Sequence, residues 1–126
     1  MRILIAEDDE ILQNLLDIYM NDWGYHFDIA SNGMEAVELA QKNEGKYDLC
    51  LMDIQMPKMN GIEAAKIIRR TVKYFPILAY STNARYKSKC IEAGMDSFIR
   101  KPCAHNDLFA KINALLPEAK KSLLPE

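Results

Sequence analysis

The chain has 126 residues, which fits one domain, and its 16 basic and 18 acidic residues leave a net charge of −2 with no bulk attraction to nucleic acid or an anionic membrane. Hydrophobic residues make up 49%, but no apolar run approaches the roughly 20 residues of a membrane span, and the first residues turn acidic too soon for a signal peptide. The three cysteines lack the spacing of a disulfide scaffold or zinc site, so we expect a cytoplasmic protein that binds neither nucleic acid nor membrane directly.

The first half of the chain alternates apolar runs with stretches of helical periodicity. Residues 2–6 predict a strand, and residues 10–23 predict a helix that Asp9 can cap and Gly24 can end. The next predicted elements are a strand over 25–29, a turn at 31–33, a helix around 36–40 and a strongly apolar strand over 47–52 that stops at Asp53.

The second half repeats this pattern. Asn60 can cap a helix that runs through Arg70, with Glu63 placed to complete a capping box. The remaining predicted elements are a strand over 76–80, a helix over 83–93 closed by Gly94, a strand over 97–100 and a last helix with Leu108, Ile112, Leu115 and Leu116 on one face, which Pro117 stops. We expect one domain over residues 1–117 and a tail or linker over 118–126.

Five strands alternating with five helices imply an α/β domain with a parallel sheet covered on both faces. Right-handed crossovers leave few topologies for such a chain. Open sheets of this kind bind ligands beyond the carboxyl ends of their strands, near the point where the strand order reverses. The polar residues that follow the predicted strands are therefore the candidate functional residues.

Carboxylates, hydroxyls and one ammonium group follow four of the five predicted strands: Glu7, Asp8 and Asp9; Asp53; Ser81 and Thr82; and Lys101. Carboxylates that share a site raise one another's pKa unless a cation lies between them. Asp8 and Asp53, with a backbone carbonyl and waters, would suit Mg²⁺, a hard cation that takes oxygen ligands. The metal and Lys101 could neutralise a phosphoryl group, and Ser81 could donate a hydrogen bond to it.

Each of these residues also has a plainer explanation when it is taken alone. Asp9 is a good helix cap, an acidic triplet after a strand is often solvated surface, and Lys101 before a proline suits an ordinary surface lysine. Asp53 is harder to dismiss, because it ends an apolar run where an unpaired buried carboxylate would be costly. The prediction of a site rests on all of them meeting at one edge of the sheet.

Four segments of the chain form a specific pattern: residues 3–10, 52–61, 78–84 and 98–102. Together they resemble the receiver domain of two-component response regulators, and the similarity runs from Arg2 to Leu116. The segment over 52–61, Met-Asp-Ile-Gln-Met-Pro-Lys-Met-Asn-Gly, is the most specific of the four. The resemblance implies a flavodoxin-like, doubly wound fold with strand order 2-1-3-4-5.

The resemblance also implies a role for each site residue. Asp53 would accept a phosphoryl group from a phosphohistidine of a sensor histidine kinase or a histidine phosphotransfer protein. Mg²⁺ would be bound by Asp8, by Asp53, by the backbone carbonyl of Gln55 and, through water, by Glu7. Lys101, in a cis Lys101-Pro102 unit, would contact the phosphoryl group, Ser81 and Phe98 would form the switch, and Gln55 and Asn83 would tune dephosphorylation.

Three positions differ from the commonest pattern of that family. Ser81 replaces a more frequent Thr and keeps the hydroxyl, whereas Thr82 replaces a smaller residue and would narrow access to the phosphoryl group. Phe98 replaces a common Tyr, so the switch would depend on packing rather than on a hydroxyl hydrogen bond.

The implied output surface is the face formed by the last two helices and the fifth strand, where a downstream protein would bind. Tyr86, Cys90 and Phe109 either lie on this face or are scattered surface residues. We expect output through protein contacts or phosphate relay, from a stand-alone regulator or from the receiver of a hybrid sensor kinase.

Two other functions compete with signalling. A Mg²⁺-dependent phosphatase of the haloacid-dehalogenase type would place its aspartate nucleophile after the first strand, whereas the isolated carboxylate here follows the third. A flavodoxin-like cofactor binder would need a phosphate loop where this chain has an acidic cluster, which repels phosphate. We therefore expect a receiver that is not an enzyme beyond Mg²⁺-dependent self-phosphorylation and self-dephosphorylation.

Overall fold

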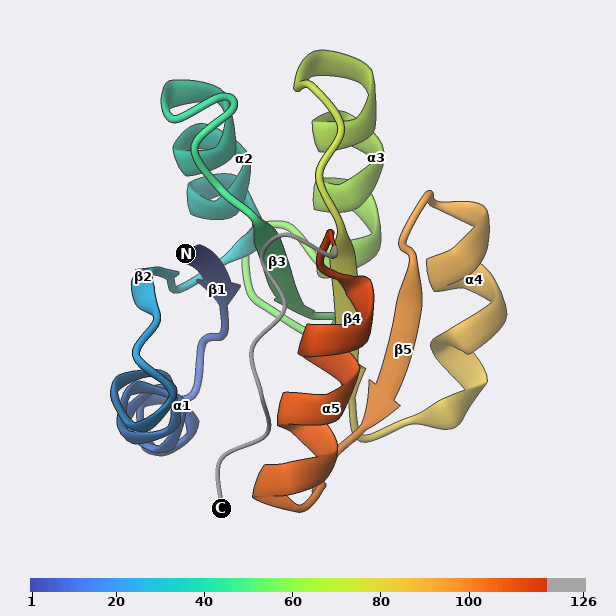
Figure 1. Cartoon of the computed structure of the whole chain (residues 1–126). Helices are drawn as coiled ribbons and strands as arrows, with labels where there is room; N and C mark the ends of the chain where they lie inside the picture. The colour runs from blue at the N-terminus through green and yellow to red at the C-terminus, as the bar shows by residue number, and fades with distance from the viewer. Residues whose placement is uncertain (118–126) are drawn as a thin grey trace.

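The computed structural model describes residues 1–117 and folds them into one parallel sheet with helices on both faces (Figure 1). The strand order is β2-β1-β3-β4-β5, which confirms the predicted fold class. The strands are β1 (Arg2–Ala6), β2 (His26–Ala30), β3 (Leu49–Asp53), β4 (Ile77–Ser81) and β5 (Ser97–Arg100). The helices are α1 (Glu10–Trp23), α2 (Gly33–Lys42), α3 (Gly61–Thr71), α4 (Lys87–Glu92) and α5 (His105–Leu115). The predicted tail over 118–126 lies outside the described residues.

Alternate side chains of β1 divide the core into two layers. Leu4 and Ala6 join a buried cluster under α2, α3 and α4, whereas Ile3 and Ile5 join a second cluster under α1 and α5. Every residue of the two central strands β3 and β4 is buried, as expected for parallel strands covered on both faces. Asp53 and Ser81 are the last residues of these strands, so the sheet itself fixes their backbone positions.

The surface next to β5 differs from the prediction at two positions. Cys90 in α4 and Phe109 in α5 are buried, and only Tyr86 remains partly exposed, so the suggestion that Cys90 and Phe109 contribute to an output face is wrong. Phe109 packs edge-on against Trp23 of α1, with 5.2 Å between the ring centroids. Its neighbour Leu108 is also buried, so the apolar face of α5 is wide enough to contact both the sheet and α1.

The fourth helix is shorter than the predicted helix over 83–93. A 3₁₀ turn at Ala84–Tyr86 precedes α4. Asn83 is extended, and its side chain accepts a hydrogen bond of 2.9 Å from the backbone N–H of Arg85. The Asn83 side chain therefore caps the 3₁₀ turn, and α4 begins only after this turn. Gly94, with φ of 97°, closes the helix as predicted.

The start of α3 has the predicted cap. The Asn60 side chain accepts a 2.9 Å hydrogen bond from the Glu63 N–H and donates one of 2.9 Å to the Glu63 carboxylate. The pair is reciprocal like a capping box, although the carboxylate binds the Asn60 side chain and not its backbone.

Replacing Asn60 by Ala removes this cap and is expected to lower the free energy of unfolding by about 1 kcal/mol. Urea denaturation of the Asn60→Ala variant measures the loss, and Asn60→Asp, which keeps the acceptor, serves as the matched control. An unchanged midpoint for Asn60→Ala would show that the cap does not contribute to stability.

Candidate functional site

The carboxyl ends of the strands bring the predicted acidic residues together. Carboxylate oxygens of Glu7, Asp8 and Asp53 all lie within 4.8 Å of one another. Glu7 follows β1 and is buried, Asp53 ends β3 and is buried, and Asp8 is exposed to solvent. The three groups therefore form one acidic cluster with an open side toward water.

Lys101 enters this cluster from the end of β5. Its ammonium nitrogen lies 2.7 Å from Glu7 Oε1 and 3.2 Å from Asp53 Oδ1, and the residue is buried. Its backbone N–H donates a 2.8 Å hydrogen bond to the carbonyl of Ser81, and the Lys101–Pro102 bond is cis, as expected. A buried ammonium group requires charged partners of this kind, so Lys101 is a component of the site and not a surface lysine.

The environment of Asp53 disfavours its charged form. Burial, followed by the neighbouring Glu7 carboxylate, raises the pKa of Asp53 to about 6. Lys101 and a 2.8 Å hydrogen bond from the Ile54 N–H oppose this shift but do not cancel it. The cluster thus has more negative charge than one ammonium group neutralises, and a further cation would stabilise it.

The oxygen donors of the cluster fit a hard divalent cation. Carboxylates with an open, solvated side are the ligands that Mg²⁺ takes, because this ion keeps several of its waters. Gln55, whose carbonyl is the predicted additional ligand, is an exposed residue two positions after Asp53.

The other predicted site residues lie at or behind the same edge of the sheet. Ser81 is buried, and its Oγ accepts a 3.2 Å hydrogen bond from the Asn83 N–H. Thr82 is exposed, and Asn83 is engaged in capping the 3₁₀ turn. Phe98 is partly buried and packs against the cluster under α2, α3 and α4.

Sequence reasoning missed three residues that support the site. The Gln13 side chain donates a 2.6 Å hydrogen bond to the Glu7 carbonyl, which ties α1 to the acidic cluster. The ring of Tyr80 lies against the Lys101 ammonium. Gly61 lies so close to the Asp53 backbone that a Cβ there would be 2.1 Å from the Asp53 carbonyl oxygen. Only Gly61 had a sequence signal, because it ends the most specific segment of the family resemblance.

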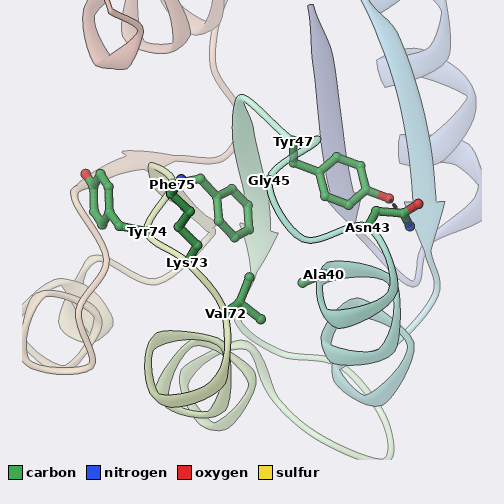
Figure 2. A pocket seen from close by; sticks show the side chains of 8 residues that line it. All are labelled: Ala40, Asn43, Gly45, Tyr47, Val72, Lys73, Tyr74 and Phe75. Carbon is green, nitrogen blue, oxygen red and sulfur yellow. Dashed lines mark hydrogen bonds between the residues drawn. The ribbon is translucent and has the colours of Figure 1, made fainter.

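A separate pocket lies between the loops that precede β3 and β4, at the end of the sheet away from the acidic cluster (Figure 2). Its volume is about 120 Å³. The Tyr47 hydroxyl donates a 2.7 Å hydrogen bond to Asp28, and the Tyr74 hydroxyl donates one of 2.6 Å to Asp96. These polar groups already have protein partners, so the acidic cluster remains the candidate functional site.

The class defined by this fold and site is the receiver domain of two-component signalling. The family model described as "Response regulator receiver domain" matches residues 3–113, and the chain belongs to that family. It is a signalling module and not a classical enzyme, and this match gives no support to the phosphatase alternative.

Two curated relatives show the same family. Hybrid signal transduction histidine kinase B of Dictyostelium discoideum is 37% identical over 88% of this chain, which spans 6% of that protein. Response regulator MprA of Mycobacterium leprae is 31% identical over 95% of this chain, which spans 53% of that protein. The chain thus matches only part of each relative.

Solved structures share the fold over most of the chain. The response regulator TrrA from Thermotoga maritima, in complex with Mg²⁺–BeF, superposes with a TM-score of 0.83 at 32% identity, covering 91% of this chain and 98% of that chain. A chain in the co-crystal structure of the Saccharomyces cerevisiae histidine phosphotransfer protein Ypd1 with the receiver domain of Ssk1 gives 0.83 at 29% identity, covering 91% and 88%. None of the helices within residues 1–117 has the length and apolar composition to cross a membrane.

Proposed function

We propose that residues 1–117 act as a phosphoryl-accepting receiver in which Asp53 is the acceptor. The observation that carries the proposal is the meeting of Glu7, Asp8 and Asp53 with the buried ammonium of Lys101 at one edge of the sheet. A carboxylate beside a fixed cation and a candidate metal site is suited to attack a phosphoryl group, because the added negative charge is neutralised where it arrives.

The transfer conserves atoms and electrons in one displacement. A carboxylate oxygen of Asp53 forms a bond to the phosphorus of a phosphohistidine, and the bond between phosphorus and the imidazole nitrogen breaks. The leaving imidazole keeps the electron pair and takes up a proton. The Ile54 N–H and Lys101 hold Asp53 Oδ1, which fixes the orientation of the carboxylate before the donor arrives.

A magnesium ion would be bound by Asp8, by Asp53 and by the Gln55 carbonyl, with Glu7 acting through water. The bound ion would supply positive charge in addition to that of Lys101 and so help to neutralise the charge of the phosphoryl oxygens. Lys101 is already held at the acidic cluster by Glu7, which keeps its ammonium group close to the acceptor.

The phosphoryl donor would be a sensor histidine kinase or a histidine phosphotransfer protein, in line with the Ypd1 complex of the similar receiver. On phosphorylation, the Ser81 hydroxyl and the Phe98 ring would shift together and change the face formed by α4, β5 and α5, where a downstream protein would bind. Gln55 and Asn83 flank the site and would set the lifetime of the phosphorylated state.

The test is incubation of the protein with a small phosphodonor, with and without Mg²⁺, followed by intact-mass measurement. We expect the gain of one phosphoryl group only with Mg²⁺, and no gain for Asp53→Ala. Failure of the wild-type chain to gain mass, together with no stabilisation by beryllofluoride, would contradict the proposal.

A second arm of the experiment addresses the phosphatase alternative. Hydrolysis of a phosphate monoester that is lost in Asp8→Ala but kept in Asp53→Ala would point to an aspartate nucleophile after β1. The receiver proposal predicts no such turnover in either variant or in the wild-type chain.

A further inference from the structure

The Lys101 ammonium has an aromatic partner as well as its two carboxylates. Its nitrogen lies 4.8 Å from the centroid of the Tyr80 ring, within the range of a cation–π interaction. Both residues are buried, with Tyr80 5% exposed and Lys101 9% exposed, so water screens this contact little. Glu7, Asp53 and the ring thus surround the ammonium group from different elements of the fold.

The position of the ring is fixed by its surroundings. Tyr80 lies in β4 directly before Ser81 and pairs in register with Ile99 of β5. Its side chain belongs to the buried cluster under α1 and α5, and its hydroxyl lies 4.0 Å from the Cys103 sulfur. Tyr80 therefore contacts residues on either side of Pro102, the Lys101 ammonium and the Cys103 sulfur, and its place in the buried cluster restricts its movement.

The two carboxylates that hold Lys101 are also candidate ligands of the metal. A divalent cation that binds Asp53 directly and Glu7 through water draws on both carboxylates and would weaken their hold on the ammonium group. The aromatic face is the partner for which the metal does not compete, since a hard cation takes oxygen ligands. Lys101 then stays beside the acceptor through its contact with the ring.

We infer that Tyr80 is a positioning residue for phosphoryl transfer, which holds the Lys101 ammonium at Asp53 when metal and phosphoryl groups occupy the carboxylates. This inference rests on the proposed function of Asp53. It assigns the role to the electron-rich ring and not to the hydroxyl group, so the two can be separated by substitution.

The kinetic test compares Tyr80→Leu with Tyr80→Phe. Loss of the ring in Tyr80→Leu is expected to slow Mg²⁺-dependent phosphorylation by a small phosphodonor about 3- to 30-fold, the range that corresponds to a partly desolvated cation–π contact. Tyr80→Phe keeps the ring and is expected to restore the rate to within about 3-fold of the wild type. Equal rates for Tyr80→Leu and the wild type would overturn the inference.

A spectroscopic readout separates positioning from general damage to the core. In the folded wild-type chain, the ring current of Tyr80 should shift the ε-methylene protons of Lys101 upfield, with the resonance assigned by its absence in Lys101→Arg. The shift should persist in Tyr80→Phe and when saturating Mg²⁺ and beryllofluoride are added. An unshifted resonance in the wild type, or loss of the shift with Mg²⁺ and beryllofluoride, would overturn the inference even if Tyr80→Leu fails to fold.

The outcomes also distinguish this inference from the proposed function. If the wild-type chain gains no phosphoryl group, the function of Asp53 fails, and with it the role of Tyr80 in transfer. If the wild type gains the group while Tyr80→Leu and Tyr80→Phe react at the wild-type rate, Asp53 remains the acceptor and only the positioning role is wrong.

Discussion

Asp53→Asn is expected to stabilise the domain at neutral pH in the absence of divalent cations, although it removes the proposed phosphoryl acceptor. The fold raises the pKa of Asp53 from 3.8 to about 6, chiefly through burial and then through the Glu7 carboxylate. The charged form is thus less favourable in the folded protein than in the unfolded chain. Removing that charge is expected to raise the free energy of unfolding at pH 7 by about 2 kcal/mol, allowing for some solvent screening.

The stabilisation by Asp53→Asn should depend on pH, because Asp53 loses its proton at a higher pH in the folded protein than in the unfolded chain. Between about pH 4 and pH 6 the folded protein holds the Asp53 proton while the unfolded chain has released it. The contribution of Asp53 to the free energy of unfolding therefore falls as the pH rises through this window. The advantage of Asp53→Asn should be absent near pH 4 and complete above about pH 6.

Urea denaturation with a chelator at pH 4 and at pH 7 measures the difference between the two proteins. Asp8→Asn is the matched control, because Asp8 belongs to the same cluster but is exposed, and it should change stability little. A gain for Asp53→Asn that is equal at both pH values would mean that packing, and not charge, causes it.

Magnesium should oppose this difference in stability. A ligand that binds only the folded state stabilises it by an amount that grows with the logarithm of its concentration relative to its Kd, and the wild-type cluster has one more carboxylate than the variant. Titration with Mg²⁺ at pH 7 is therefore expected to stabilise the wild type more than Asp53→Asn. The excess negative charge that destabilises the cluster without a divalent cation is also the cause of its affinity for one.

The alternation of strands and helices and the edge of the sheet that carries the site were predictable from the sequence because they depend on local patterns. Apolar runs alternate with amphipathic helices, and the candidate site residues mark the ends of four of the five strands, as at Asp53 and Ser81. The carboxyl ends of parallel strands lie at the same edge of the sheet, so the strand pattern alone predicts that these residues meet there. The common location of the site residues follows from this, whereas the strand order 2-1-3-4-5 was implied only by the family resemblance.

Contacts between distant side chains were not predictable in the same way. Lys101 and Glu7 are 94 positions apart, and their 2.7 Å contact depends on how β5 packs beside the rest of the sheet. Tyr80 has no local feature that separates it from other apolar strand residues, because its role depends on which cation lies over its ring. The boundary of α4 was also missed, since the Asn83 side chain caps a 3₁₀ turn at the point where the helix was expected to begin.

Gly61→Ala is expected to destabilise the domain by about 3 kcal/mol, at the upper end of the range for overpacked sites. A Cβ at this position would lie 2.1 Å from the Asp53 carbonyl oxygen and 2.9 Å from Cγ of Met52. Alanine normally favours a helix over glycine, so a loss at the first residue of α3 would have to come from this clash. The nearest atom belongs to the backbone and cannot rotate away.

Gly24→Ala provides the matched control at the end of α1. Gly24 has a positive φ of 76°, but nothing lies within 4 Å of a Cβ built there. That variant should lose only about 1 kcal/mol, the cost of a left-handed backbone for alanine. Urea denaturation of both variants separates backbone strain from steric overlap, and equal losses would contradict the role of the clash.

Gly61→Ala should also slow phosphorylation, because the clash involves the acceptor residue Asp53 itself. The Gly61 N–H donates a 2.8 Å hydrogen bond to the Ile54 carbonyl, so α3 begins directly against the loop that follows Asp53. Relief of the overlap requires movement of this loop or of the last residue of β3, and either movement displaces the carboxylate from Lys101. The folded fraction of Gly61→Ala should therefore accept a phosphoryl group more slowly than that of Gly24→Ala, whose substitution lies outside the site. Equal rates would mean that the helix, and not the acceptor, moves to accommodate the methyl group.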